Sequence, residues 1–97
     1  MSAEHTDSTG AQATVATGDN QFTISVDGRQ VGLIDFYDRD GVRTFTHTEV
    51  DPAFGGRGLA TILVGEALQA ARAAGLRIAS HCSMVTQYIG KHPEFRD

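Results

Sequence analysis

The sequence has 97 residues, so it can form one domain at most, with a single modest core. Its 8 Lys and Arg residues against 12 Asp and Glu give a formal net charge of -4, which argues against non-specific binding to nucleic acid or anionic membranes. No apolar run approaches bilayer-spanning length, and no basic region followed by an apolar stretch is visible at the N-terminus, so we expect no secretory signal. The lone Cys82 cannot form an internal disulfide, which fits a reducing compartment. We therefore expect a soluble cytoplasmic protein, either a monomer or a weak dimer.

The first segment, residues 1–20, consists mainly of Ser, Thr, Ala, Gly, Gln and acidic residues, with Val15 as its only branched aliphatic residue. Such a composition buries too little apolar surface to offset the entropy lost on ordering. The sequence therefore predicts a disordered tail over residues 1–20 and an ordered domain over residues 21–97.

Three strands in an antiparallel meander are predicted next. From Gln21, apolar and polar residues alternate with the period of two that is typical of a half-buried strand. Asp27-Gly28 can form a type I′ hairpin turn, which needs two positive φ angles, and a second turn is expected at Asp38–Gly41. The segment that follows is rich in Thr, Val and Phe, which favour strands. The predicted strands cover residues 21–26, 30–37 and 42–50.

Helical patterns dominate the rest of the chain. Asp51-Pro52 ends the third strand, because proline has no amide to donate to a sheet. A helix is predicted from Gly58 to Ala74, where apolar residues recur at the spacing of one buried face, and Gly75 ends it. A short strand over 76–80 and a short helix over 83–91 complete a mixed α/β fold in the order βββαβα.

Gly55, Gly56 and Gly58 lie between the end of a strand and the start of the long helix. Glycine lets the backbone approach a ligand closely, and the unpaired amides of a first helical turn attract anions. The pattern therefore predicts a phosphate-binding turn, although the glycines could also serve only as a tight connection. Neither the P-loop motif nor the GxGxxG dinucleotide motif is present.

Three blocks, His47–Val50, Phe54–Ala60 and Cys82–Phe95, together resemble the small single-domain GNAT-like proteins of the GCN5-related N-acetyltransferase superfamily. The similarity covers residues 21–97. It implies a minimal GNAT-like fold with a mixed, mainly antiparallel sheet, a central helix and a short C-terminal helix. It also implies that acetyl-CoA binds with its pyrophosphate on the loop amides and its pantetheine arm along the preceding strand, where two parallel strands splay apart.

Carried over residue by residue, the resemblance assigns the contacts with coenzyme A (CoA). The family's loop opens with Arg or Gln at a position that Gly55 occupies here, so Arg57 is expected either to supply the missing cation or to face solvent. Glu49 and Val50 are expected beside the pantetheine arm. The whole expected set for the cofactor is Glu49, Val50, Gly55, Gly56, Arg57, Gly58, Leu59 and Ala60.

Four residues are candidates for the chemistry. His47 and Glu49 share one face of a strand and could form an acid–base pair, or only a surface pair. Cys82 precedes a helix, whose dipole favours the thiolate, and the resemblance places a cysteine near the acyl end of the cofactor; it could equally be a small buried residue. The resemblance makes Tyr88 a possible proton donor to the leaving thiolate, with core packing as the alternative. His5 and His81 show no metal-ligand spacing with other His or Cys residues, so no metal is expected.

The resemblance implies an acetyl-CoA-dependent N-acetyltransferase that acts on a protein lysine, a polypeptide end or a small amine. Asp27-Gly28 joins two strands directly, where larger GNAT proteins have helices that shape the acceptor site. Two alternatives stay open. One is a module that binds CoA without turnover, which the absent Arg or Gln and the open acceptor side would favour. The other is a structural domain that binds no ligand.

Overall fold

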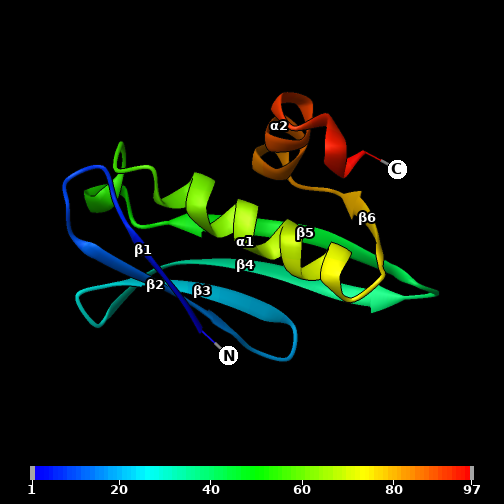
Figure 1. Cartoon of the computed structure of the whole chain (residues 1–97), viewed down its shortest axis with the longest axis horizontal. Coiled ribbons are helices and arrows are strands. Elements are labelled where there is room, and N and C mark those ends of the chain that lie inside the picture. Colours follow the sequence, from blue (N-terminus) through cyan, green and yellow to red (C-terminus); the bar gives the residue numbers. More distant parts are fainter. Residues whose placement is uncertain (1, 97) are drawn as a thin grey trace.

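The computed structural model describes residues 2–96, which form one mixed sheet with two α-helices packed on it (Figure 1). Neighbours in the sheet follow chain order, and all pairs are antiparallel except β5 and β6, which are parallel. The mixed α/β fold with a mainly antiparallel sheet is therefore confirmed. The strands are β1 (Ser2–Thr6), β2 (Gln12–Thr17), β3 (Gln21–Val26), β4 (Arg29–Arg39), β5 (Val42–Val50) and β6 (Arg77–Ser80). The helices are η1 (Pro52–Phe54), α1 (Leu59–Ala73), α2 (Ser83–Lys91) and η2 (Pro93–Phe95), of which η1 and η2 are short 3₁₀ turns.

The prediction of a disordered tail over residues 1–20 is wrong for the residues that the structure describes. β1 pairs with β2, and β2 pairs with β3, so this segment extends the sheet by two strands. Ala13 and Val15 lie in the core with 0% and 3% of their surface exposed. Composition underestimated the segment because backbone hydrogen bonds to β3 and small buried side chains can order a strand that has few large apolar residues.

The central meander follows the prediction closely. Asp27 and Gly28 have φ angles of 49° and 84°, the two positive values that a type I′ turn requires. One irregularity separates β4 from β5: Asp35 lies opposite His47 and Phe36 lies opposite Phe45, so Thr46 is an extra residue in β5. Such a bulge changes which side chains face each side of the strand beyond it.

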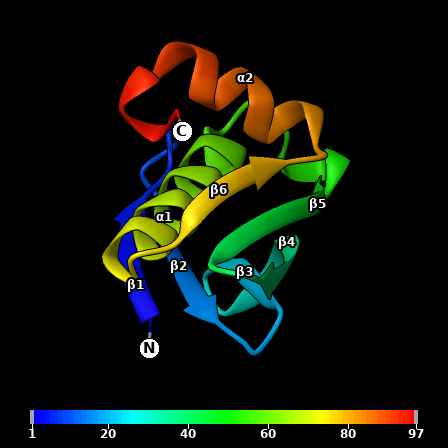
Figure 2. The same ribbon diagram turned by 90° about the vertical axis from the view of Figure 1, so that its right-hand side faces the viewer.

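The core lies between the sheet and α1, which crosses one face of the sheet (Figure 2). α1 contributes its buried leucines, and the sheet contributes Ile24, Ile34 and Phe45, all fully buried. α2 packs against α1, where the buried Gly65 leaves room for the ring of Tyr88. Among the described residues, neither helix is both long and apolar enough to cross a membrane.

Candidate active site

The site begins where β6 ends before β5 does. β6 pairs with β5 only over Val42–Phe45, and the last link is the His81 amide donating to the Phe45 carbonyl at 2.8 Å. The chain then turns into α2, while β5 continues to Val50. The edge of β5 from Thr46 onward thus faces a gap between two parallel strands, as the resemblance implied. Main-chain groups along an open strand edge can bind an extended ligand that carries amides.

Two cavities adjoin at this gap. The larger, about 570 Å³, is lined by β4, by the end of β5 with Glu49 and Val50, and by Met84 of α2. The smaller, about 250 Å³, lies between α1 and α2 and is lined by Ala60, Met84 and Lys91, among others. Because Met84 lines both, a long ligand could extend from the first turn of α1 past the start of α2 into the gap.

The glycine loop has the geometry of an anion-binding turn. Gly56 and Gly58 have φ angles of 75° and 76°, the left-handed region that favours glycine. Gly58 caps α1, and the first helical bond in the described structure runs from the Ile62 amide to the Gly58 carbonyl at 3.1 Å. The amides of Leu59 and Ala60 therefore have no carbonyl earlier in the helix to bond. They lie beside the smaller cavity, which Ala60 lines.

Arg57 fulfils neither expectation for its side chain. It neither points at the cofactor side as a free cation nor faces solvent, because its guanidinium contacts the buried carboxylate of Asp7 at 2.6 Å and 2.7 Å. It also lies 4.9 Å from the ring centre of Phe54. Sequence reasoning missed this pairing because Asp7 lies in the segment that was predicted to be disordered.

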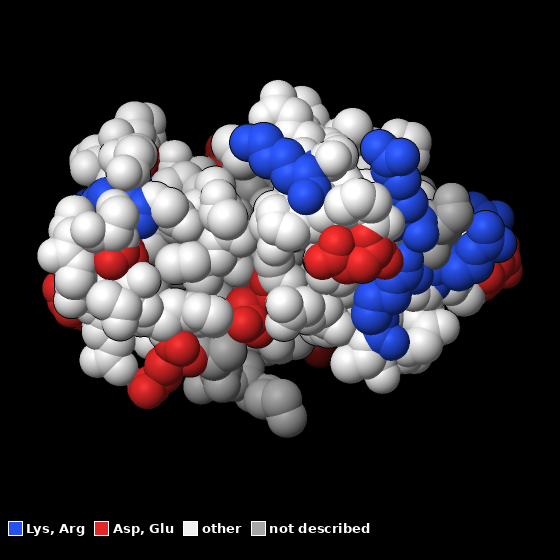
Figure 3. Space-filling model, turned by 45° about the horizontal axis from the view of Figure 1, so that its top comes forward, with Lys and Arg blue, Asp and Glu red and all other residues white. Residues whose placement is uncertain are grey.

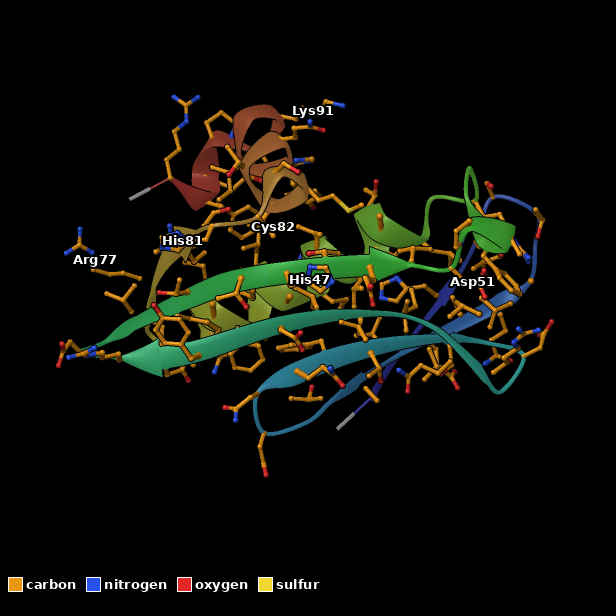
Figure 4. The ribbon with its side chains drawn as sticks, turned by 180° about the vertical axis from the view of Figure 1, so that it is seen from behind. His47, Asp51, Arg77, His81, Cys82 and Lys91 are labelled. Atoms are coloured by element: carbon orange, nitrogen blue, oxygen red, sulfur yellow. The ribbon has the colours of Figure 1, made fainter. Side chains whose placement is uncertain are left out.

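Lys91 supplies a cation that the sequence prediction overlooked. It lies in the last turn of α2 and lines the smaller cavity, together with Gln87 one turn earlier (Figure 4). The spacing of Met84, Gln87 and Lys91 along one helical face was the signal that could have identified it. The Arg side chains on the face shown in Figure 3 gather mainly in its right-hand half, with a smaller blue patch at its left end.

Cys82 lies at the N-cap of α2, half-buried beside β5 (Figure 4). Its thiol donates to the hydroxyl oxygen of Thr48 at 3.2 Å. Burial raises the pKa of the thiol, but the hydrogen bonds that Thr48 and the amides of Val85, Met84 and Thr48 make with the thiolate form outweigh burial and leave the pKa below its ordinary value. The structure therefore places an unusually acidic thiol at the gap, with Thr48 as a partner that the sequence did not single out.

His47 and Glu49 lie on the same face of β5, as predicted, with the imidazole Nε2 3.4 Å from the carboxylate. Their side chains are 55% and 64% exposed. Thr48 lies between them in the strand and points to the opposite face, where Cys82 is. The pair and the thiol are therefore on different sides of one strand, and Glu49 reaches the larger cavity.

Tyr88 serves to pack α2. Its ring stacks on His92 with centres 4.0 Å apart and also contacts Phe95. A Cβ added at Gly65 would lie only 2.8 Å from its hydroxyl oxygen, so the hydroxyl points at α1. Burial and the nearby Glu94 carboxylate raise its pKa, which makes Tyr88 a weaker acid than an ordinary tyrosine.

Comparison with known proteins agrees with this geometry. A family model described as GCN5-related N-acetyl-transferase matches residues 21–97. The chain therefore belongs to this family of acetyl-CoA-dependent N-acetyltransferases. No curated protein matches the chain in a sequence search.

Solved structures share the fold at low sequence identity. A GCN5-like protein from Staphylococcus aureus has a TM-score of 0.65 at 24% identity, over 84% of this chain and 81% of its own. Aminoglycoside N-acetyltransferase AAC(6')-Iy in complex with CoA has 0.57 and 23%, over 84% of this chain and 63% of its own. The ribosomal-protein-S18-alanine N-acetyltransferase of Escherichia coli has 0.59 and 17%, over 64% and 42%. The last two enzymes are thus considerably longer than this chain.

Proposed function

We propose that this chain transfers the acetyl group of acetyl-CoA directly to a primary amine, which arrives protonated and loses a proton before it attacks, in the gap beside the end of β5. The observation that carries the proposal is that the gap brings together an open strand edge, the first turn of α1 and the thiol of Cys82. Each feature suits one part of acetyl-CoA. The strand edge suits the amides of the pantetheine arm, the first turn of α1 suits the pyrophosphate, and the thiol suits the acyl end.

CoA binding would use main-chain groups more than side-chain cations. The amides of the loop and of Leu59 and Ala60 would hold the pyrophosphate with help from the dipole of α1. Lys91, across the smaller cavity, would supply the positive charge that neither Gly55 nor Arg57 provides. Glu49 and Val50 would lie beside the pantetheine arm as it enters the larger cavity.

The acceptor would enter through the larger cavity, whose wall carries the carboxylate of Glu49 and no Lys or Arg among its lining residues. Such a wall favours a cationic amine over a neutral or anionic acceptor. The adjacent His47–Glu49 pair would take the proton that the amine must lose before it attacks.

The chemistry needs a proton for the departing thiolate. The neutral amine nitrogen attacks the thioester carbonyl, the carbon–sulfur bond breaks, the nitrogen loses its second excess proton to solvent, and the CoA sulfur takes a proton. Cys82 suits this role better than Tyr88, because its lowered pKa makes it the stronger acid and its hydrogen bonds stabilise the thiolate that remains. Because this role needs a free thiol, we place the protein in the cytoplasm.

The test is release of free CoA thiol from acetyl-CoA, followed with and without a simple primary amine such as Nα-acetyl-lysine. Amine-dependent release that falls at least tenfold in Glu49→Gln and Cys82→Ala supports the proposal. Arg77→Ala, on the exposed side of β6, is the matched control and should react like the wild type. Tight CoA binding with no acetylated product from any amine would instead identify a CoA-binding module without turnover.

A further inference from the structure

The turn between β1 and β2, residues 7–11, lies directly against the glycine loop. The Ser8 amide donates to the Arg57 carbonyl at 3.0 Å, and the Ser8 hydroxyl donates to the Gly56 carbonyl at 3.4 Å. The Arg57 guanidinium reaches back to the Asp7 carboxylate at 2.6 Å and to the Thr9 hydroxyl at 3.0 Å. Both main-chain and side-chain contacts therefore join the two segments across about fifty positions of sequence.

Asp7 is placed to hold both sides of this contact. Its side chain is 0% exposed. One carboxylate oxygen accepts the amide and hydroxyl of Thr9 and the amide of Ala11, which fixes its own turn. The other oxygen accepts the guanidinium of Arg57. Because its two oxygens bind different segments, this buried carboxylate couples the conformation of the turn to the position of the glycine loop.

These contacts also set the direction of the loop amides. Both carbonyls that Ser8 binds point toward the turn, and in a trans peptide the next amide points the opposite way. The amides of Arg57 and Gly58 therefore point away from the turn. In Figures 1 and 4 the turn lies on the far side of the loop from α2, so these amides are directed toward the side where the anion would bind.

We propose that the turn of the N-terminal hairpin, residues 7–11 between β1 and β2, is part of the CoA-binding site and that Asp7 is a positioning residue, which holds the glycine loop in its binding form through Arg57. The hairpin lies outside the residues 21–97 that the family model matches. The inference rests on the proposed function, because it assigns the loop to CoA. Its physical reason is that a glycine-rich loop has many alternative conformations, and holding one of them in advance removes that cost from binding.

The test is calorimetry with CoA on Asp7→Asn. Asparagine keeps one oxygen for Thr9 and Ala11 but presents an amide group to Arg57, so it breaks only the link to the loop. If the competent loop falls to about a tenth of the population, the Kd for CoA rises about tenfold. The kcat at saturating acetyl-CoA should stay near the wild-type value, because Asp7 touches nothing at the acyl end.

His5→Ala is the matched control. It removes the 2.9 Å contact between His5 and Glu66, a polar contact between the hairpin and α1, and leaves the loop contacts intact. It should lower the melting temperature without changing the Kd for CoA. Arg57→Gln should match Asp7→Asn, and the double variant should add little, because both substitutions break one interaction.

Three results would overturn the inference. An unchanged Kd in folded Asp7→Asn and Arg57→Gln would show that the hairpin supports the fold alone. Tighter binding in Asp7→Asn would show that Arg57 is a phosphate ligand that Asp7 withholds. Wild-type protein that binds no CoA would remove the proposed function itself, a failure that is visible before any variant is measured.

Discussion

A single hydroxyl group decides much of the chemistry of Cys82. Thr48 lies beside the thiol because the bulge at Thr46 shifts the alternation of β5, so that Thr48 points toward α2 and its two neighbours point away. The amides at the start of α2 add to its effect. The lowered pKa of the thiol therefore depends on both elements, because β5 contributes Thr48 and the start of α2 contributes main-chain amides.

Thr48→Val tests this environment. Valine has nearly the same shape but cannot donate to a thiolate, so the pKa of Cys82 should rise toward that of an ordinary thiol. Alkylation by iodoacetamide at neutral pH should slow by about three- to tenfold, the effect of losing one hydrogen bond. The matched control is Thr17→Val, an exposed position on β2 in another part of the sheet, which should leave the rate unchanged. Equal rates in both variants would show that Thr48 does not tune the thiol.

If Cys82 lies at the acyl end of the cofactor, bound CoA should also protect it from alkylation. The wild-type thiol should react quickly near neutral pH, and saturating CoA should slow the reaction because it covers the sulfur. A rate that CoA fails to change would place the thiol away from the ligand and would remove Cys82 from the proposed mechanism.

Asp7 should make the stability of the fold depend on pH in the acid range. Burial raises its pKa, but bonds from Thr9, Ala11 and Arg57 outweigh burial and lower it from 3.8 to about 2. A carboxyl whose folded-state pKa is depressed stabilises the fold above the unfolded value of 3.8, and this stabilisation is lost as the pH falls through about 2. The melting temperatures of wild type and Asp7→Asn should differ most at pH 5 and converge toward pH 2. A gap that does not vary with pH would contradict this assignment.

At the level of elements, α2 packs on α1 through a contact between Tyr88 of α2 and Gly65 of α1. The ring of Tyr88 occupies the space that a side chain at Gly65 would fill, and it also contacts His92, between α2 and η2, and Phe95 of η2. Since Cys82, Met84 and Lys91 all belong to this segment, the fit between the two helices sets the width of the smaller cavity.

Gly65→Ala should therefore destabilise the fold by about 1 kcal/mol. The new Cβ would lie 2.8 Å from the Tyr88 hydroxyl, and the cost of overpacking should exceed the gain in helix propensity of up to about 1 kcal/mol. In a Tyr88→Phe background the hydroxyl is absent, so the same substitution should become neutral or stabilising. Urea unfolding of the four proteins measures the sign, and an equal effect in both backgrounds would contradict the contact.

How far the sequence predicts these elements depends on the kind of signal each one carries. β3, β5 and α2 match their predicted bounds because alternation, turn residues and a following proline are local signals. β1 and β2 were missed because their order comes from pairing with β3, which composition does not reveal. The partner of Arg57 was missed for the same reason, and Lys91 because its role depends on the distance between two helices.

At the scale of the whole molecule, the sheet has two parts with different tasks. β4, β5 and β6 surround the gap, whereas β1 and β2 form the opposite edge of the sheet from β6. The hairpin contacts α1 through His5 and the glycine loop through Asp7. It therefore connects the first two strands both to the long helix and to the loop that precedes it. In a chain of only 97 residues the hydrophobic core is small, so these contacts should contribute a large share of the stability.

A chain that lacks residues 1–18 should lose much of its stability. Removal exposes the edge of β3, removes buried Val15 and leaves Arg57 without its carboxylate. Burial of a valine alone contributes about 1.5–3 kcal/mol, and 1 kcal/mol corresponds to about 4–8 °C in a domain of this size. The melting temperature should therefore fall by more than about 10 °C, or the shortened chain should fail to fold.

Point variants keep this prediction testable if the shortened chain does not fold. Val15→Ala in the full chain should cost about 1–2 kcal/mol, because the cavity it leaves lies between β2 and the core. Thr17→Ala, an exposed position on the same strand, should stay within about 0.5 kcal/mol of the wild type. A shortened chain that melts at the wild-type temperature would show that residues 21–97 are self-sufficient. The two N-terminal strands would then be a dispensable extension of the sheet.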